Sequence, residues 1–260
     1  MRRKYRAIWL SDVHLGTGAS RAGDLLAFLE DVSAEVIYLA GDIVDVQRLK
    51  IRPTFPAVHR QVVGRFLELA REGTRMIYIP GNHDIEFRRL AGGNICGIEI
   101  ELEASHLCAD GRRLLVAHGD CIDPRIRNGS FAEQFGSAAY RWLVEADARV
   151  NQLRHRFGKD YASFSTTVKL RLKSASDYID RFEETAARYA SARGFDGIVC
   201  GHIHRPCIRQ IEGVCYANDG DWVEHRTALG ETTDGQLQLL RWTTAALTVE
   251  PASRPVPVAA

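Results

Sequence analysis

The residues best suited to chemistry in this chain lie in five short polar motifs, each of which follows a run of apolar residues. They read Asp12-Val13-His14, Gly41-Asp42-Ile43-Val44-Asp45, Gly81-Asn82-His83-Asp84, His118-Gly119-Asp120 and Gly201-His202-Ile203-His204. Together they supply carboxylates, imidazoles and one amide, a set that suits borderline or hard divalent metal ions. No motif contains a cysteine, which disfavours a structural zinc site. The motifs therefore indicate a metal centre assembled from distant parts of the chain.

The elements that must position these motifs alternate between strands and helices. Apolar runs predict strands at 5–10, 36–40, 75–79 and 114–117, and helical spacing of apolar residues predicts helices at 24–32 and 58–72. This order is typical of a mostly parallel sheet covered by helices. Because ligands of such sheets bind beyond the carboxyl ends of the strands, we expect the motifs to converge on one place.

The second half of the chain begins with long helices and ends with short strands. Residues 131–157 and 161–192 contain almost no glycine or proline and predict two long helices, with Gly194 ending the second. Short strands are predicted at 197–200, 207–211, 214–217, 222–226 and 237–242. We therefore predict a core of residues 1–120 and 195–249, a helical insertion at 121–194 and a disordered tail at 250–260.

Composition restricts the class of protein. The 260 residues are 45% hydrophobic and 26% charged, which is ordinary for a soluble globular protein. Lysine and arginine number 34 against 33 acidic residues, so a polybasic nucleic-acid-binding protein is disfavoured. The sequence shows neither a signal-peptide core nor an apolar stretch long enough to span a membrane. Its six cysteines form no CxxC pair and are expected to be free thiols in a cytoplasmic protein.

Taken in order, the five motifs resemble those of the calcineurin-like metallophosphoesterases. The resemblance covers about residues 5–227 and implies an α/β fold, the metallophosphoesterase-type αββα layered sandwich with a helical insertion, or lid. It also implies two divalent metal ions. One would be held by Asp12, His14, Asp42 and His204, and the other by Asp42, Asn82, His118 and His202, with Asp42 bridging. Mn²⁺ is the first choice, because the ligands combine nitrogen and oxygen without sulfur.

The resemblance gives other motif residues roles in catalysis. His83 would donate to the leaving oxygen or to a phosphoryl oxygen in the transition state. Asp84 is grouped with His83 as catalytic, and Asp84 and Asp45 are expected to orient imidazoles. The histidines outside the motifs are expected to be structural; these are His59, His106, His155 and His225.

Further segments resemble one branch of this family, the UDP-2,3-diacylglucosamine diphosphatases. The similar segments are 161–165, 169–173, 200–204 and 216–224. Those enzymes cleave a nucleotide–lipid diphosphate to UMP and 2,3-diacylglucosamine 1-phosphate in lipid A synthesis. The resemblance implies a cytoplasmic enzyme and leaves open a peripheral contact with the inner membrane surface. The best characterised members carry arginine where this chain has His83.

The helical insertion is basic over part of its length. Residues 141–173 include eight basic and three acidic residues, a net charge of +5. A positive field of this kind suits a diphosphate or anionic lipid headgroups. Lys169, Lys173, Arg154 and Ser165 are therefore predicted to bind the substrate, whose acyl chains would enter the apolar interior of the insertion. A solvated helix face would explain the same charges.

Two other functions remain open on the sequence. A metal-dependent phosphodiesterase or nuclease would need a long basic groove with stacking aromatic residues, which the net charge of +1 disfavours and the basic segment keeps open. A non-enzymatic module that binds proteins through the same fold should have lost metal ligands or the catalytic histidine, and all of these are present. The sequence does not predict an oligomeric state.

Overall fold

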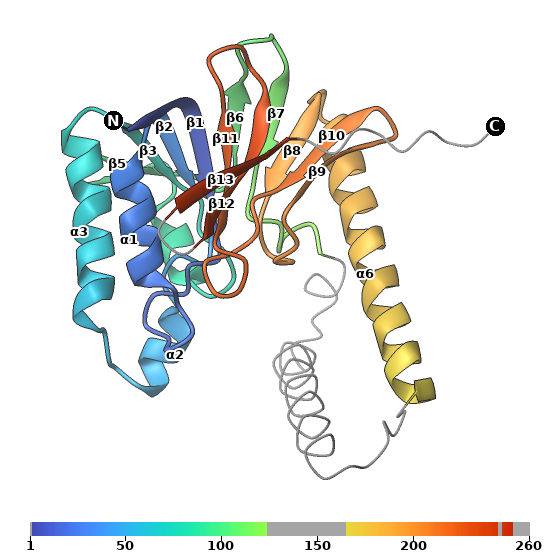
Figure 1. The fold of residues 1–260 in the computed structure, drawn as a ribbon, viewed down its shortest axis with the longest axis horizontal. Helices are drawn as coiled ribbons and strands as arrows, with labels where there is room; N and C mark the ends of the chain where they lie inside the picture. Colours follow the sequence, from blue (N-terminus) through green and yellow to red (C-terminus); the bar gives the residue numbers. More distant parts are fainter. Residues whose placement is uncertain (1, 124–164, 244–245, 252–260) are drawn as a thin grey trace. The chain divides into compact units, whose positions relative to one another are not determined.

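Two β-sheets form the centre of the fold (Figure 1). The computed structural model describes residues 2–123, 165–243 and 246–251, with only the backbone for 165–176, so the helix predicted at 131–157 lies outside the described residues. The larger sheet has the order β13-β12-β11-β1-β2-β3-β5-β4. Its parallel centre consists of β1 (Arg3–Leu10), β2 (Val32–Leu39), β3 (Arg75–Tyr78) and β5 (Ile98–Ile100). The antiparallel strands are β11 (Thr227–Glu231), β12 (Leu237–Thr243), β13 (Ala246–Pro251) and β4 (Asn94–Ile95).

The smaller sheet has the order β6-β7-β8-β10-β9. Its parallel strands are β7 (Arg113–Val116), β8 (Gly197–Cys200) and β10 (Val214–Asn218). The antiparallel strands β6 (Ala104–Leu107) and β9 (Cys207–Ile211) form its two edges. Both sheets therefore have a parallel centre, whose carboxyl ends supply the polar motifs.

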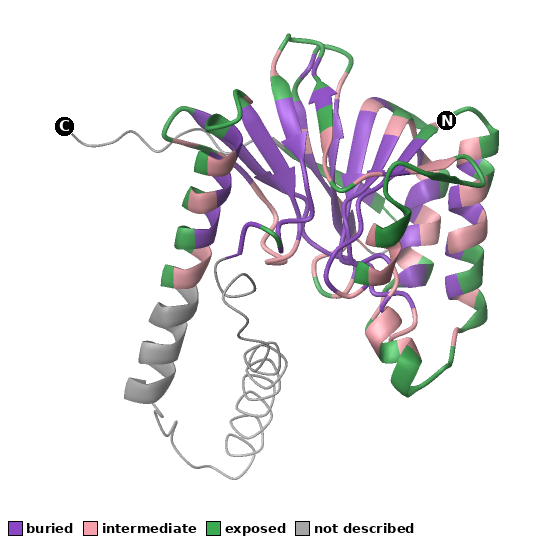
Figure 2. Ribbon diagram, turned by 180° about the vertical axis from the view of Figure 1, so that it is seen from behind, coloured by how far each residue is buried: buried purple, intermediate pink, exposed green. Residues whose placement is uncertain are grey.

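Apolar side chains hold the layers together. Helices α1 (Ala22–Asp31) and α3 (Ala57–Arg71) cover one face of the larger sheet, with Phe28 and Phe66 buried against it. The other face packs on the smaller sheet, because Trp9 and Tyr38 share a buried cluster with Val116. Most strand residues are buried in consequence (Figure 2). The predicted α/β layered sandwich is confirmed.

The chain divides into two compact units. One contains residues 1–120 and 183–260, and the other contains residues 121–182. Helix α6 (Ser165–Ser191) continues from the second unit into the first. From Glu183 onward its residues therefore fall in the first unit. Within the core, Oε2 of Glu183 forms an ion pair with the guanidinium of Arg209 in β9 at 2.8 Å. This contact connects that part of α6 to the smaller sheet.

Two C-terminal predictions differ from the structure. The strand predicted at 222–226 is a turn, and the strand β11 begins at Thr227. The reason is the buried carboxylate of Asp221, which accepts the backbone N–H groups of Val223, Glu224 and His225 and so bends the chain. Residues 250 and 251, predicted to begin the disordered tail, pair with β12. Residues 252–260 lie outside the described residues.

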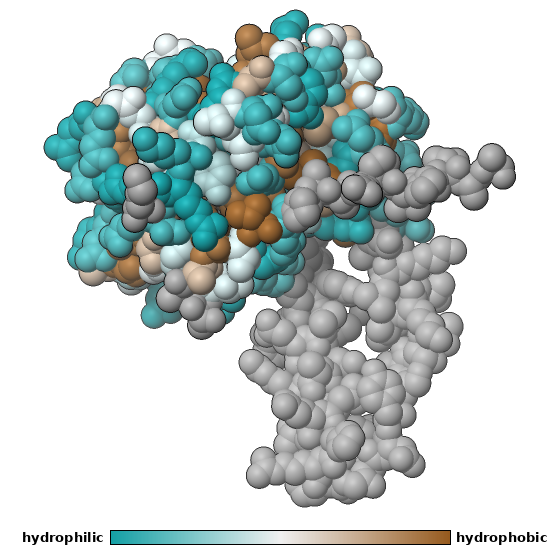
Figure 3. Space-filling model, turned by 45° about the horizontal axis from the view of Figure 1, so that its top comes forward, coloured by the Kyte–Doolittle hydropathy of each residue, from teal (hydrophilic) through white to brown (hydrophobic). Residues whose placement is uncertain are grey.

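The surface of the described residues is mostly hydrophilic on the face drawn in Figure 3, with separate apolar spots. No helix in the described part of the chain has both the length and the apolar character that crossing a bilayer requires.

Candidate metal centre

Loops from both sheets meet at the carboxyl ends of their parallel strands. Asp12 and His14 follow β1, Asp42 follows β2, and Asn82 follows β3. His118 follows β7 of the smaller sheet, and His202 and His204 follow β8. Three groups of potential ligands at these strand ends have their donor atoms within 4.8 Å of one another among the described residues. The first contains Asp12, His14 and His204, the second Asp12, Asp42 and His118, and the third His14, Asp45 and His83. The fold therefore brings together residues that lie up to 192 positions apart in the sequence.

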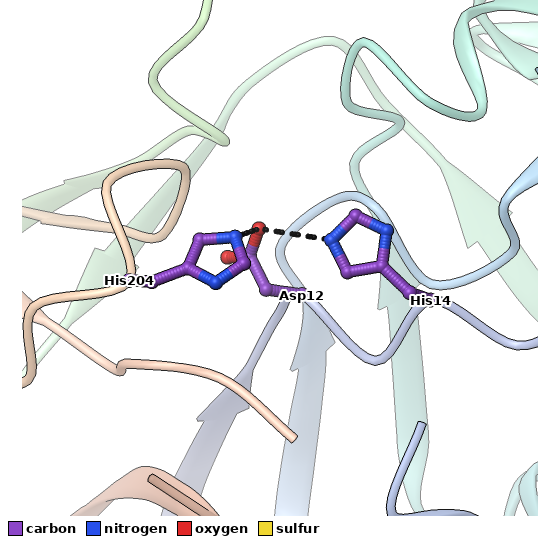
Figure 4. Close-up of side chains that lie close together, drawn as sticks. All are labelled: Asp12, His14 and His204. Atoms are coloured by element: carbon purple, nitrogen blue, oxygen red, sulfur yellow. Dashed lines mark ion pairs between the residues drawn. The ribbon is translucent and has the colours of Figure 1, made fainter. Parts of the chain in front are cut away.

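The first group is centred on one oxygen of Asp12. Its Oδ1 atom lies 2.9 Å from Nε2 of His204 and 3.8 Å from Nε2 of His14, and Figure 4 shows the carboxylate between the two imidazoles. Nε2 of His14 is also 3.9 Å from Oδ2 of Asp42. These four residues are the set predicted for one ion.

The second group is centred on Asp42. Its Oδ2 atom lies 3.5 Å from Nε2 of His118, and that nitrogen is 3.3 Å from Oδ1 of Asn82. The rings of His118 and His202 are 5.3 Å apart, centroid to centroid. Because Oδ2 of Asp42 also faces His14, this carboxylate lies between the two groups, where a bridging ligand would be.

The chemistry of the donor atoms fits divalent cations. Nδ1 of His118 pairs with the carbonyl oxygen of Ala40 at 2.8 Å, so the tautomer consistent with this contact leaves Nε2 available to a metal. Oδ1 of Asp12 is buried, accepts no backbone N–H or hydroxyl hydrogen bond among the described residues, and has the imidazoles of His204 and His14 as its polar neighbours. A buried carboxylate oxygen without a donor is costly unless a cation or a charged imidazole compensates it.

The backbone of the site is strained. Five of the seven predicted ligands have φ between 50° and 68°, in the left-handed region: Asp12, His14, Asp42, His202 and His204. Each such residue costs about 1–2 kcal/mol, and such strain is concentrated at functional sites. The site is also closely packed, because a Cβ atom on Gly81 would lie 2.3 Å from Oδ1 of Asp42. The surrounding fold therefore holds these side chains in a conformation that the local chain would not choose.

The acidic and basic groups of the site shift one another's pKa. Burial alone would raise the pKa of Asp42, but the imidazoles of His118, His14 and His83 hold it well below its usual range. Burial alone would lower the pKa of His204, but the adjacent Asp12 carboxylate raises it to about 9. The pKa of His118 is raised in the same way, with Asp42 as the main cause opposing burial. The site therefore stabilises positive charge.

His83 lies beside the ligands and is partly exposed. Its Nδ1 atom is 3.2 Å from Oδ2 of Asp45, and its side chain is 31% exposed. Its backbone N–H donates to Oδ1 of Asp42 at 2.8 Å. Asp45 also lies 3.5 Å from Nδ1 of His14, so this carboxylate contacts two imidazoles, as expected for an orienting residue. Burial would lower the pKa of His83, but Asp45 and Asp42 raise it.

The carboxylate of Asp84 contacts no imidazole among its described hydrogen bonds. It accepts the backbone N–H groups of Gly81 at 2.6 Å and Ile43 at 2.7 Å, together with the hydroxyl of Tyr78 at 2.5 Å. This residue is fully buried. The described hydrogen bonds of Asp84 therefore differ from the expected orientation of an imidazole, and its predicted catalytic role stays a prediction. These hydrogen bonds join the loops after β2 and β3, so Asp84 positions Asp42 through the backbone.

Several residues outside the predicted ligand set support the site. Asp221 lies 2.5 Å from Nδ1 of His225 and 3.9 Å from Nδ1 of His204. Both carboxylate oxygens of Asp120 accept the guanidinium of Arg88 at 2.7 Å, and Arg88 also donates to the carbonyl of Pro80. Asp120 lies in one of the five motifs, and Asp221 lies in a segment similar to one branch of the family. The sequence therefore marked both residues as notable but did not indicate their partners.

The side chains of the predicted substrate-binding residues lie outside the described part of the structure. Arg154 lies outside the described residues. Ser165, Lys169 and Lys173 lie in α6, in the part for which only the backbone is described.

Comparisons with known proteins point to one family. The family model described as "Calcineurin-like phosphoesterase" matches residues 5–206. A UDP-2,3-diacylglucosamine hydrolase of Azotobacter vinelandii is 26% identical over 78% of this chain and 83% of its own length. One from Edwardsiella ictaluri is 24% identical over 88% of this chain and 89% of its own length. Among solved structures, a single mutant of Vps29 from Entamoeba histolytica covers 94% of this chain and 96% of its own, with 11% identity and a TM-score of 0.48.

Proposed function

Because this chain belongs to the calcineurin-like phosphoesterase family, whose members are hydrolases acting on phosphorus–oxygen bonds, we propose that it cleaves a nucleotide–lipid diphosphate with the help of two divalent cations. The substrate we propose is UDP-2,3-diacylglucosamine, with UMP and 2,3-diacylglucosamine 1-phosphate as products. The names of the relatives that align with most of this chain support this choice. The enzyme would act in lipid A biosynthesis.

The observation that carries the two-cation proposal is the position of Asp42. Its Oδ2 atom lies within 3.9 Å of one imidazole from each ligand group, His14 and His118. We assign Asp12, His14, Asp42 and His204 to one cation and Asp42, Asn82, His118 and His202 to the other. Mn²⁺ is the ion we propose, since the donors are nitrogen and oxygen. Bound cations of this kind polarise phosphoryl oxygens and lower the pKa of water.

The chain's own residues contribute orientation and a proton. Asp45 contacts Nδ1 of His83, and Nε2 of this partly exposed ring lies 4.0 Å from Oδ2 of Asp42, at the edge of the proposed metal centre. His83 would donate a proton from Nε2 to the leaving oxygen or a hydrogen bond to a phosphoryl oxygen. Asp84 would keep Asp42 in place through the backbone of its loop.

Recognition of the nucleotide–lipid is assigned to the helical insertion. We propose that Lys169, Lys173, Arg154 and Ser165 bind the substrate and that the net charge of +5 over residues 141–173 attracts its diphosphate. The same charge would favour a peripheral contact with an anionic membrane surface on the cytoplasmic side.

A substrate panel tests this function. The Mn²⁺-loaded protein is incubated with UDP-2,3-diacylglucosamine, with UDP-glucose, with a small aryl phosphodiester and with single-stranded DNA, and the products are separated and quantified. We expect release of UMP from the acylated substrate at the highest kcat/KM. Hydrolysis of the aryl diester alone would contradict the lipid substrate and leave the phosphoesterase intact. Preferred cleavage of DNA would favour the nuclease alternative.

A further inference from the structure

Two buried polar residues lie behind Asp12. The hydroxyl oxygen of Ser11 is 2.5 Å from Oδ2 of Asp12 and 2.6 Å from Oδ1 of Asp219, with the carbonyl of Gly220 more distant at 3.4 Å. Asp12 and Asp219 are 0% exposed, and Ser11 is 1% exposed. Water therefore cannot reach these groups to replace either hydrogen bond unless the packing changes. Two carboxyl groups thus share one hydroxyl in the interior of the protein.

The number of protons in this contact determines how it is arranged. A serine hydroxyl has one proton and can donate it to only one of the two carboxyl groups. The other short contact requires a proton on a carboxyl oxygen. Asp12 is the charged partner, because its Oδ2 also accepts the backbone N–H of His202 at 3.0 Å and its Oδ1 lies beside His204.

Asp219 is consequently the group that holds the extra proton. Its Oδ2 atom has no hydrogen-bond partner among the described residues, so a charge there would be uncompensated. Burial raises the pKa of Asp219 well above its usual range, in agreement with this assignment. Asp219 donates to Oγ of Ser11, and Ser11 donates to Oδ2 of Asp12.

The packing around this chain of hydrogen bonds leaves it little freedom. A Cβ atom on Gly201 would lie 2.0 Å from Oγ of Ser11 and 2.4 Å from Oδ2 of Asp12, so the loop that carries His202 and His204 fits against the pair only with glycine there. The amide of Asn218 donates to the carbonyl of Gly201 at 2.7 Å. The ends of β1, β8 and β10 are thereby joined around Asp12.

We propose that Asp219, acting through Ser11, is a positioning residue that holds the Asp12 carboxylate in its ligand orientation and so sets the cation affinity of the Asp12–His14–His204 group. The inference rests on the proposed two-cation function. It predicts a selective effect, since the proposed ligand sets assign Asp12 to one cation although it also lies near Asp42 and His118. Asp42 itself is held by a separate set of contacts, from His83 and from the loop that Asp84 supports. Removing Asp219 should weaken one cation and spare the other.

Calorimetric titration of the chelator-treated protein with Mn²⁺ tests this selectivity. We expect Asp219→Ala and Ser11→Ala to weaken one binding step by about 10–100-fold, the usual effect of losing a residue that supports a ligand. Asp219→Asn should stay within a few-fold of the wild type, because its amide can donate to Ser11 as the protonated acid does. The weakened step should be the one that His14→Ala removes and not the one that Asn82→Ala removes.

A buried carboxylate elsewhere provides the control. Glu231→Gln changes a residue that is also 0% exposed and contacts no predicted ligand, so both binding steps should be unchanged. Unchanged binding in both Asp219→Ala and Ser11→Ala would overturn the proposal, as would equal weakening of both steps. If Asp219→Ala does not fold, Ser11→Ala, which removes one hydroxyl, makes the same test. A wild-type protein that binds a single ion would contradict the two-cation function, while the effect of these variants on that ion would still decide the role of Asp219.

Discussion

Two buried clusters in this protein contain similar residues and differ in what they can do. At the strand ends, aspartates face imidazoles. Between the sheets, His106, Cys108 and Glu231 also have donor atoms within 4.8 Å of one another. In this second cluster Nε2 of His106 pairs with Oε2 of Glu231 at 2.8 Å, and Nδ1 pairs with the hydroxyl of Tyr38. The other oxygen of Glu231 accepts from Arg6 and from the backbone N–H of Ala109.

The difference between the two clusters lies in the partners of their polar atoms and in backbone strain. The polar atoms of His106 and Glu231 are all partnered within the protein, and burial raises the pKa of the Cys108 thiol to about 12, which keeps it protonated. Residues 106, 108 and 231 have no left-handed φ, whereas five predicted ligands at the strand ends do. The presence of residue types that could bind a metal is therefore not enough to identify a metal site. A strained backbone that directs several carboxylates and imidazoles toward one another is the more informative sign.

Replacing the shared carboxylate should have the largest effect. In Asp42→Ala both cation positions lose their common ligand, so we expect both ions to be lost and activity to fall by more than about 10⁴-fold, beyond the contribution of one acid–base group. Metal analysis of the purified variant is the measurement. Glu231→Gln should keep both ions and lose only about 1–3 kcal/mol of stability through an imperfect buried network. One ion retained at full occupancy in Asp42→Ala would contradict the bridging role.

His83 should affect the chemical step without affecting metal content. Because its imidazole lies beside the ligands and is not assigned to either cation, His83→Ala should retain both ions and lose kcat by about 10²–10⁴-fold. Steady-state kinetics and metal analysis on the same preparation test this. His106→Ala, in the other cluster, should reduce stability and leave kcat of the folded protein nearly unchanged. Loss of metal in His83→Ala would make His83 a ligand, and unchanged kcat would exclude its catalytic role.

The two clusters should respond oppositely to pH in the metal-free protein. The pKa of His204 is raised to about 9, so its contribution to stability is complete below about pH 6.5, its unfolded value, and is lost as the pH rises through 9. Burial lowers the pKa of His106, so that residue costs stability as the pH falls below 6.5.

Urea denaturation in the presence of chelator measures this response. We expect the free energy of unfolding to fall by on the order of 2 kcal/mol between pH 6.5 and 9.5, and His204→Gln to flatten that fall. His106→Gln should instead reduce the loss below pH 6.5. An identical pH profile in wild type and His204→Gln would show that the Asp12–His204 pair does not have the charge state described above.

The smallest effect is expected at the helical insertion. If the basic residues of this segment hold the diphosphate, Lys169→Ala with Lys173→Ala should raise KM for the nucleotide–lipid several-fold and leave metal binding intact. Hydrolysis of a small aryl phosphodiester, which needs only the strand-end centre, should barely change. An equal loss on both substrates would assign these lysines a structural role and remove the main support for the lipid substrate.

Much of the site was predictable because its residues follow strands whose apolar pattern is local. Asp12, Asp42, Asn82, His118 and His202 each stand just beyond an expected strand, and parallel strands place their carboxyl ends together. The strand predicted at 222–226 was wrong because one side chain, Asp221, captured three backbone N–H groups. Local propensity contains no information about such a competing partner.

By itself the sequence determined the types of the candidate ligands, their order and the edge of the sheets where they meet. These depend on the identity of each residue and on its distance from a strand end. Only the tertiary structure decided that Asp84 braces backbone amides, that Asp42 faces imidazoles from both groups, and that Asp219 reaches Ser11 from 208 positions away. The physical reason is that a buried polar atom must find its partner among whatever packing brings within about 3 Å, and that neighbour is set by the whole fold.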